Sequence, residues 1–174
     1  MSPSPEKSDR TRGYVVPIGG AEERTGSMRV LRRFVRLCGG SRARIVIIPT
    51  ASQLADTGER YIEIFSKLGV KNAVSLPIAE RADAERIEYI EKLDNATGIF
   101  ITGGNQLRLS TILGGTLVAQ KVRRLNAAGI HVAGTSAGAA IMPEHMIAGG
   151  SMGLSPQADG VNLAPGLGLT NALI

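Results

Sequence analysis

Ile130-His131-Val132-Ala133-Gly134-Thr135-Ser136-Ala137-Gly138 is the stretch that decides the fold of this chain. It runs from apolar residues that favour a β-strand, through a tight turn of small residues, into a helix-compatible segment. This order predicts a nucleophile elbow with Ser136 at its apex, because the strained turn accepts only small flanking residues. The N–H of Ala137 would then stand at a helix N-terminus and could stabilise an oxyanion. The alternative is an idle serine in a glycine-rich turn, since 22 glycines in 174 residues produce such patterns by chance.

Apolar runs like the one before the elbow recur along the chain, and each ends at a turn-forming residue. They predict strands at 14–18, 44–48, 97–101 and 130–133, and a weaker one at 72–76. Helical periodicity of apolar residues lies between them, at 28–38, 61–68, 87–93 and 117–125. This alternation predicts an α/β fold with a doubly wound, mostly parallel sheet and helices on both faces. We expect a disordered tail over 1–12 and a single α/β domain over 13–174.

The residues that follow each predicted strand matter most, because ligands of such sheets bind outside the carboxyl ends of the strands. After the 97–101 run, Gly103 and Gly104 would let the backbone approach a substrate closely, and Gly104 is a candidate for the second oxyanion donor. Asn105 and Gln106 are candidate substrate-binding residues, with Gln106 able to bond an amide or carboxylate. The alternative for this segment is a plain turn before a helix. Gly19-Gly20 only weakly resembles a dinucleotide loop, because the third glycine is missing.

Composition excludes several classes of function. Aromatic residues make up 3% of the chain, too few to stack single-stranded nucleic acid. The net charge of +5 follows from a generally arginine-rich composition, without a dense basic run for an anionic partner. Cys38 is the single cysteine, so we expect it to be buried and inert, with no disulfide. We find no secretory signal and no membrane-spanning run, and we expect a cytoplasmic protein with no membrane partner.

A serine nucleophile needs a general base, which is usually histidine. The chain has two histidines, His131 and His145. His131 lies inside the strand that leads to the elbow, where we expect a structural role. His145 follows the short helix after the elbow and would lie on the far side of that helix from the Ser136 hydroxyl. Neither position predicts a base.

Four strand-end stretches occur in an order that resembles one family. They are Ile18-Gly19-Gly20-Ala21-Glu22, Ile48-Pro49-Thr50-Ala51-Ser52, Thr102-Gly103-Gly104-Asn105-Gln106 and Gly134-Thr135-Ser136-Ala137-Gly138-Ala139. With the later Pro165-Gly166-Leu167-Gly168-Leu169, they are similar to the serine peptidase family of dipeptidase E and cyanophycinase. The resemblance implies a fold like that of class I glutamine amidotransferases, a flavodoxin-like three-layer sandwich.

The same resemblance implies an intracellular exopeptidase that cleaves cyanophycin, a polyaspartate with arginine branches, into β-aspartyl-arginine dipeptides. Ser136 would be the nucleophile, Gly104 and Ala137 would form the oxyanion hole, and Gln106 would contact the substrate. The resemblance implies no metal, no organic cofactor and a homodimer when the protein is complete.

The chain departs from the family pattern at two places. An Asp-Gln-His segment should follow the Gly-Leu-Gly-Leu stretch, where the sequence reaches Ile174. We therefore expect a C-terminally incomplete piece that lacks the catalytic histidine and is inactive alone. Pro143 stands where the family often has a small polar residue, and we expect it to shorten the helix. Two alternatives remain open: an aspartyl dipeptidase of the same family, and an inactive relative that only binds.

Overall fold

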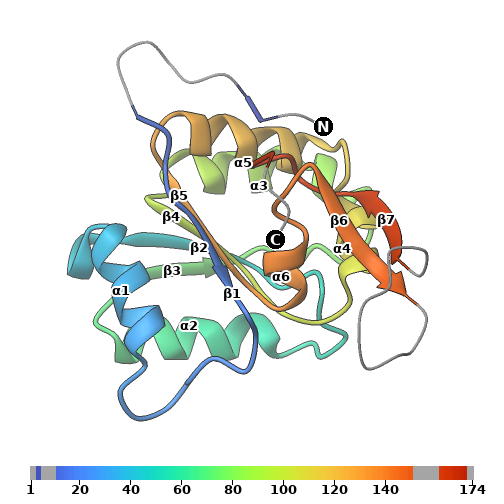
Figure 1. The fold of residues 1–174 in the computed structure, drawn as a ribbon. Coiled ribbons are helices and arrows are strands. Elements are labelled where there is room, and N and C mark those ends of the chain that lie inside the picture. Colours follow the sequence, from blue (N-terminus) through green and yellow to red (C-terminus); the bar gives the residue numbers. More distant parts are fainter. Residues whose placement is uncertain (1–2, 5–10, 151–160, 172–174) are drawn as a thin grey trace.

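The computed structural model describes residues 3–4, 11–150 and 161–171. A five-stranded parallel sheet forms its centre (Figure 1). Across the sheet the strands are β1 (Val15–Ile18), β5 (His131–Thr135), β4 (Gly98–Ile101), β2 (Arg44–Ile48) and β3 (Asn72–Ser75). All five predicted strands are present, and the prediction of an α/β fold with a mostly parallel sheet is confirmed. The tail predicted at 1–12 lies largely outside the described residues.

Helices cover both faces of this sheet. In Figure 1, α1 (Arg29–Leu37) and α2 (Thr57–Lys67) lie on one side. The other side carries α3 (Ile87–Asp94), α4 (Gln106–Leu113) and α5 (Leu117–Ala127). Two short 3-10 helices, Gly40–Arg42 and Asp83–Glu85, complete the connections.

The alternation of side chains along the strands divides the core in two. On β2, Ile45 and Ile47 pack with the α1 and α2 side, while Val46 and Ile48 pack with the opposite side. Both faces of the central strands are therefore buried, which explains why β2 and β4 read as continuous apolar runs rather than alternating ones.

Cys38 follows α1 in the smaller core. It is buried, as predicted, and carries a free thiol. Burial raises the pKa of the Cys38 thiol to about 12, so the thiolate is scarce at neutral pH. Within the described part of the chain, no helix combines the length and the apolar character that a membrane crossing requires.

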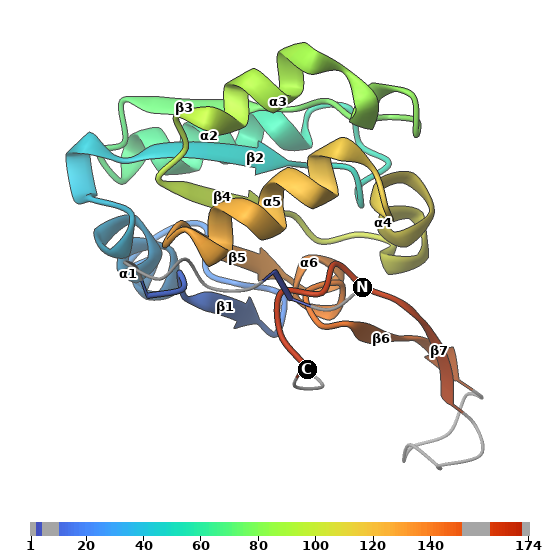
Figure 2. The same cartoon turned by 90° about the horizontal axis from the view of Figure 1, so that it is seen from above.

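A second, antiparallel pair of strands was missed by the sequence analysis. β6 (His145–Gly150) pairs with β7 (Val161–Pro165), with an irregularity between Ile147 and Gly149. Figure 2 shows this pair extending away from the main sheet. The glycines of β6 hid its strand character, because glycine is depleted in strands. The Gly166–Leu169 stretch follows β7, and its Leu167 and Leu169 are buried.

Candidate active site

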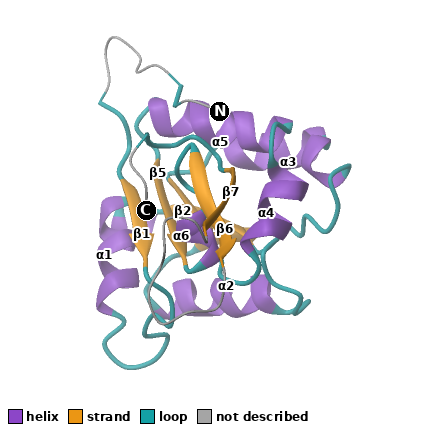
Figure 3. Ribbon diagram, turned by 45° about the vertical axis from the view of Figure 1, so that its right-hand side comes forward, coloured by secondary structure: helices purple, strands orange, loops and turns teal. Residues whose placement is uncertain are grey.

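Ser136 lies at a sharp turn between β5 and α6 (Ala137–Ala140), at the carboxyl end of the sheet (Figure 3). Its backbone has φ 51° and ψ −116°, a conformation that a non-glycine residue holds only when the surroundings enforce it. The Ser136 N–H donates to the Ile18 carbonyl of β1 at 2.9 Å, and its carbonyl accepts from the N–H of Ala139 at 2.8 Å. Ser136 as a whole is exposed. The strand, turn and helix of a nucleophile elbow are thus present.

The small residues around the turn are required by its packing. A Cβ atom at Gly134 would stand 2.3 Å from the Gly138 carbonyl oxygen. One at Gly138 would stand 2.2 Å from the Ile101 carbonyl oxygen on β4. Both distances are far below van der Waals contact, so a larger residue would displace the backbone of the elbow or of β4. The glycine spacing therefore has a steric cause.

Two further glycines border Ser136. The Cβ position of Gly20, after β1, lies 3.2 Å from the Ser136 Cβ, and that of Gly103, after β4, lies 3.3 Å from it. Gly104 has φ 145°, and a Cβ there would stand 2.1 Å from the Ala51 carbonyl oxygen. Backbone therefore surrounds the serine on the sides of β1 and β4. Ala137, which opens α6, is buried.

Asn105 and Gln106 both make contacts that connect parts of the fold. The Asn105 side chain accepts a hydrogen bond from the Arg108 N–H at 3.0 Å and so caps the N-terminus of α4. Its own N–H donates to Ala51 at 2.9 Å. The Gln106 Nε2 donates to the Ala148 carbonyl of β6 at 3.3 Å. Both side chains therefore have structural partners, and Asn105 starts the helix as the plain-turn interpretation expected.

A buried carboxylate beside the elbow was not recognised from the sequence. The Glu22 side chain is 1% exposed. It accepts hydrogen bonds from the hydroxyls of Tyr61 and Thr135, and from the Arg24 Nε at 3.0 Å. Burial by itself raises the pKa of Glu22, but the bonds from Thr135 and Tyr61 outweigh it and hold the pKa below its ordinary value. Since Thr135 directly precedes Ser136, Glu22 ties the loop after β1 to the elbow.

His131 has a structural role at the opposite end of β5. Its Nδ1 accepts from the Tyr14 N–H at 3.0 Å, and its ring stacks on Tyr14 with the centroids 5.3 Å apart. Burial lowers the pKa of His131, and a hydrogen bond to the Leu37 backbone partly opposes this. At about 3.3 Å per residue along a strand, His131 lies on the order of 16 Å from Ser136, too far to take its proton.

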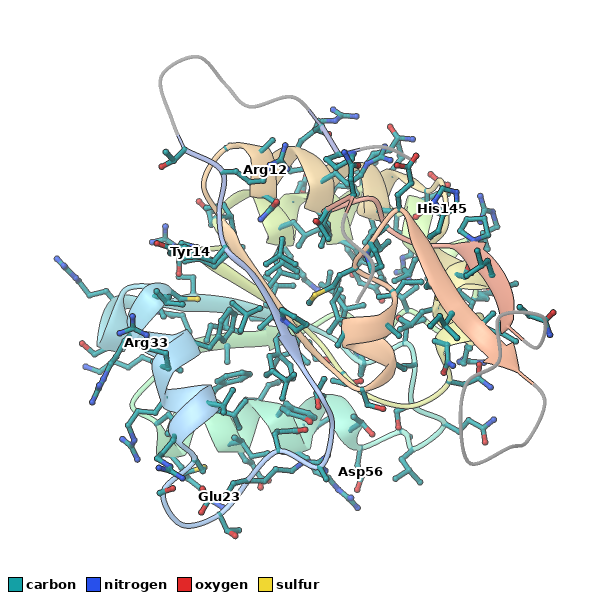
Figure 4. The ribbon with its side chains drawn as sticks, in the orientation of Figure 1. Arg12, Tyr14, Glu23, Arg33, Asp56 and His145 are labelled. Carbon is teal, nitrogen blue, oxygen red and sulfur yellow. The ribbon has the colours of Figure 1, made fainter. Side chains whose placement is uncertain are left out.

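His145 begins β6 and is exposed (Figure 4). Across the described residues, no hydrogen bond joins Ser136 to either histidine. The same residues contain no group of three His, Cys, Asp or Glu side chains that could hold a metal ion. The site is therefore an exposed serine with a strained backbone, bordered by the glycines that follow β1 and β4.

The model of peptidase family S51 matches residues 16–174, which is most of the chain and includes the elbow. The chain belongs to peptidase family S51. The resemblance stated from the strand-end motifs is thereby confirmed at the level of the family.

Curated relatives are about two fifths identical to this chain over the aligned residues. A cyanophycinase of Geminocystis herdmanii is 42% identical over 165 residues, covering 94% of this chain and 61% of that protein. A cyanophycinase of Trichormus variabilis is 43% identical over 166 residues, covering 94% of this chain and 56% of that protein. The chain thus spans a little over half the length of these relatives.

Two solved structures share the fold. A peptidase from an acI-B1 actinobacterium matches with a TM-score of 0.71 and 22% identity, covering 91% of this chain and 65% of that chain. A putative peptidase E protein from Listeria monocytogenes matches with a TM-score of 0.64 and 23% identity, covering 91% of this chain and 76% of that chain. At these identities the similarity establishes the fold alone.

Proposed function

We propose that this protein is a serine peptidase that hydrolyses cyanophycin to β-aspartyl-arginine dipeptides, with Ser136 as the nucleophile. The observation that carries the proposal is the exposed Ser136 on a strained elbow, in a chain about 42% identical to cyanophycinases. The elbow conformation aims the serine away from the sheet and leaves backbone N–H groups beside it. A cytoplasmic location and a homodimer are parts of the same proposal.

In the proposed reaction, the Ser136 Oγ attacks the carbonyl carbon of the scissile bond and its proton passes to a general base. The tetrahedral oxyanion is stabilised by the N–H groups of Ala137 and Gly104. The leaving amine takes the proton, and water then hydrolyses the acyl-enzyme and regenerates the hydroxyl. Gln106, Asn105 and Gly103 border the substrate. From the positions of His131 and His145, we infer that neither is this base.

The proposal is tested by Ser136→Ala in the full-length gene product, with release of β-aspartyl-arginine from cyanophycin as the measurement. We expect the wild type to release the dipeptide and the variant to lose at least about a thousandfold in rate, because the nucleophile is gone. Ser66→Ala, at an exposed serine of α2, is the matched control and should leave the rate unchanged.

The same assay distinguishes the two alternatives. Faster cleavage of an aspartyl dipeptide than of cyanophycin would identify the protein as an aspartyl dipeptidase, with Ser136 still the proposed nucleophile. Binding of cyanophycin by the wild type without any cleavage would identify an inactive binding relative and overturn the proposal.

A further inference from the structure

A pocket of about 460 Å³ opens beside the elbow, and we call it the Arg24 pocket. Its walls come from the loops after β1, β2 and β4 and from one side of α2. Arg24, Tyr61 and Gly103 are among its lining residues. Gly103 connects the pocket to the nucleophile, because its Cβ position lies 3.3 Å from the Ser136 Cβ. A substrate group in this pocket would therefore lie next to the reacting bond.

The Arg24 guanidinium is held in place on two sides. Its Nε donates to the Glu22 carboxylate at 3.0 Å, and its central carbon lies 5.4 Å from the centroid of the Tyr61 ring. Glu22 and Tyr61 are both buried, so they form a rigid base beneath a side chain that is itself 51% exposed. A guanidinium has five N–H donors, and the Glu22 bond engages the one on Nε. An arginine positioned in this way loses little freedom when it binds a ligand.

The charged side chains around the pocket favour recognition of an anion by hydrogen bonds from one arginine rather than by a large net positive charge. Three cationic side chains and one acidic side chain line it: Arg24, Arg60, Lys67 and Glu63. Arg60 pairs with Asp56 at 2.7 Å, and Arg24 pairs with Glu22, so carboxylates offset part of the positive charge. Recognition of an anion here would rest on the N–H groups of Arg24, which match the planar geometry of a carboxylate.

We propose that the Arg24 pocket binds the arginine branch of the substrate, with the Arg24 guanidinium bound to the free α-carboxylate of that branch. The inference rests on the proposed function, since the arginine of β-aspartyl-arginine carries a free α-carboxylate and a guanidinium. Glu63, the acidic residue of the lining, supplies a partner of opposite sign for that guanidinium. Arg24 is therefore a residue that determines specificity for a substrate with a carboxylate beside the scissile bond.

The test compares binding of β-aspartyl-arginine and β-aspartyl-argininamide by calorimetry. In the wild-type chain we expect the free acid to bind about ten times more tightly than the amide, the effect of one charge-assisted contact at a half-exposed site. Arg24→Gln should remove this difference. Arg33→Gln, on the outer face of α1, is the matched control and should preserve it (Figure 4). Equal binding of acid and amide by the wild type, or a difference that survives in Arg24→Gln, overturns the inference.

Two further measurements distinguish a failure of this inference from misfolding of the variant and from a failure of the proposed function. Arg24→Lys keeps a positive charge beside Glu22, and we expect it to fold and to retain only part of the preference for the acid. In the full-length protein, cyanophycin cleavage that depends on Ser136 but is unchanged in kcat and KM by Arg24→Gln would overturn the inference and keep the proposed function. If the preference for the free acid depends on Arg24 but the protein cleaves no cyanophycin, the proposed function is refuted and the inference about the Arg24 pocket stands.

Discussion

The hydroxyl of Thr135 donates a hydrogen bond to the buried carboxylate of Glu22, one residue before Ser136. The two residues come from distant parts of the sequence and meet where β1 and β5 end side by side. This bond gives the elbow a support from the neighbouring strand, in addition to the bond from the Ser136 N–H to Ile18. Glu22 also bonds Tyr61 and Arg24, so one carboxylate connects the nucleophile turn, α2 and the Arg24 pocket.

Replacing Glu22 should therefore destabilise the fold. We expect Glu22→Gln to lower the free energy of unfolding at neutral pH by about 2–4 kcal/mol, because buried donors and the Arg24 charge lose a charged acceptor. Urea denaturation of both proteins measures the difference. Glu91→Gln, at an exposed glutamate of α3, should change stability by less than about 0.5 kcal/mol. A Glu22→Gln protein as stable as the wild type would contradict the proposed support.

The effect of Glu22 should also depend on pH. Its pKa in the folded protein lies below the ordinary value of 4.5, so its stabilising contribution is fully present above pH 4.5. The contribution is lost as the pH falls from there through the lower folded pKa. The difference in unfolding free energy between wild type and Glu22→Gln should accordingly shrink below pH 4.5. A difference that stayed constant or grew on acidification would contradict this assignment.

The elbow glycines should not tolerate a methyl group. We expect Gly138→Ala to lower the free energy of unfolding by about 3 kcal/mol, because its Cβ would collide with the Ile101 carbonyl oxygen and β4 cannot move freely. Thermal or urea unfolding checks this value. Gly19→Ala is the control: no atom lies within 4 Å of its Cβ position, and we expect a change of less than about 1 kcal/mol. Equal stability of the two variants would show that the elbow can relax.

The strain at Ser136 predicts an unusual order of stability. Alanine and glycine both remove the hydroxyl, but only glycine adopts φ 51° without a steric penalty. We expect Ser136→Gly to be more stable than Ser136→Ala by about 1 kcal/mol. The same pair of substitutions at Ser66, within α2, should give the opposite order, because glycine weakens a helix. If alanine were the more stable residue at both positions, the elbow would not be strained.

Local sequence patterns were sufficient for the main sheet. The run at 44–48 is β2 itself, and the glycine spacing around Ser136 corresponds to a real steric requirement. These features depend on neighbouring residues, which periodicity and turn chemistry capture. Glu22 could not be found in this way, because its partners Tyr61 and Thr135 are 39 and 113 residues away. An acidic residue directly after Gly19-Gly20-Ala21 was the available signal, and it carries no information about burial.

The β6–β7 pair escaped prediction for a related reason. Its strands pair with each other across a segment that gives no strand signal, and β6 contains Gly149 and Gly150. The pair is fixed by contacts from α4, where Gln106 bonds Ala148 and the Ser110 hydroxyl donates to Pro165 at 2.7 Å. Such support from another element cannot be read from the strand sequences alone.

The place of β1 at the edge of the sheet has a consequence for synthesis on the ribosome. In the main sheet, β1 has a single neighbour, β5, and Tyr14 and His131 at the start of this pairing are 117 residues apart. At about 5–20 residues per second, β1 waits on the order of ten seconds for its partner to be translated. The Ile18 carbonyl and the Glu22 carboxylate both come from this early segment and hold the turn at Ser136. The nascent chain therefore acquires its ordered serine only after nearly all of the sheet has emerged.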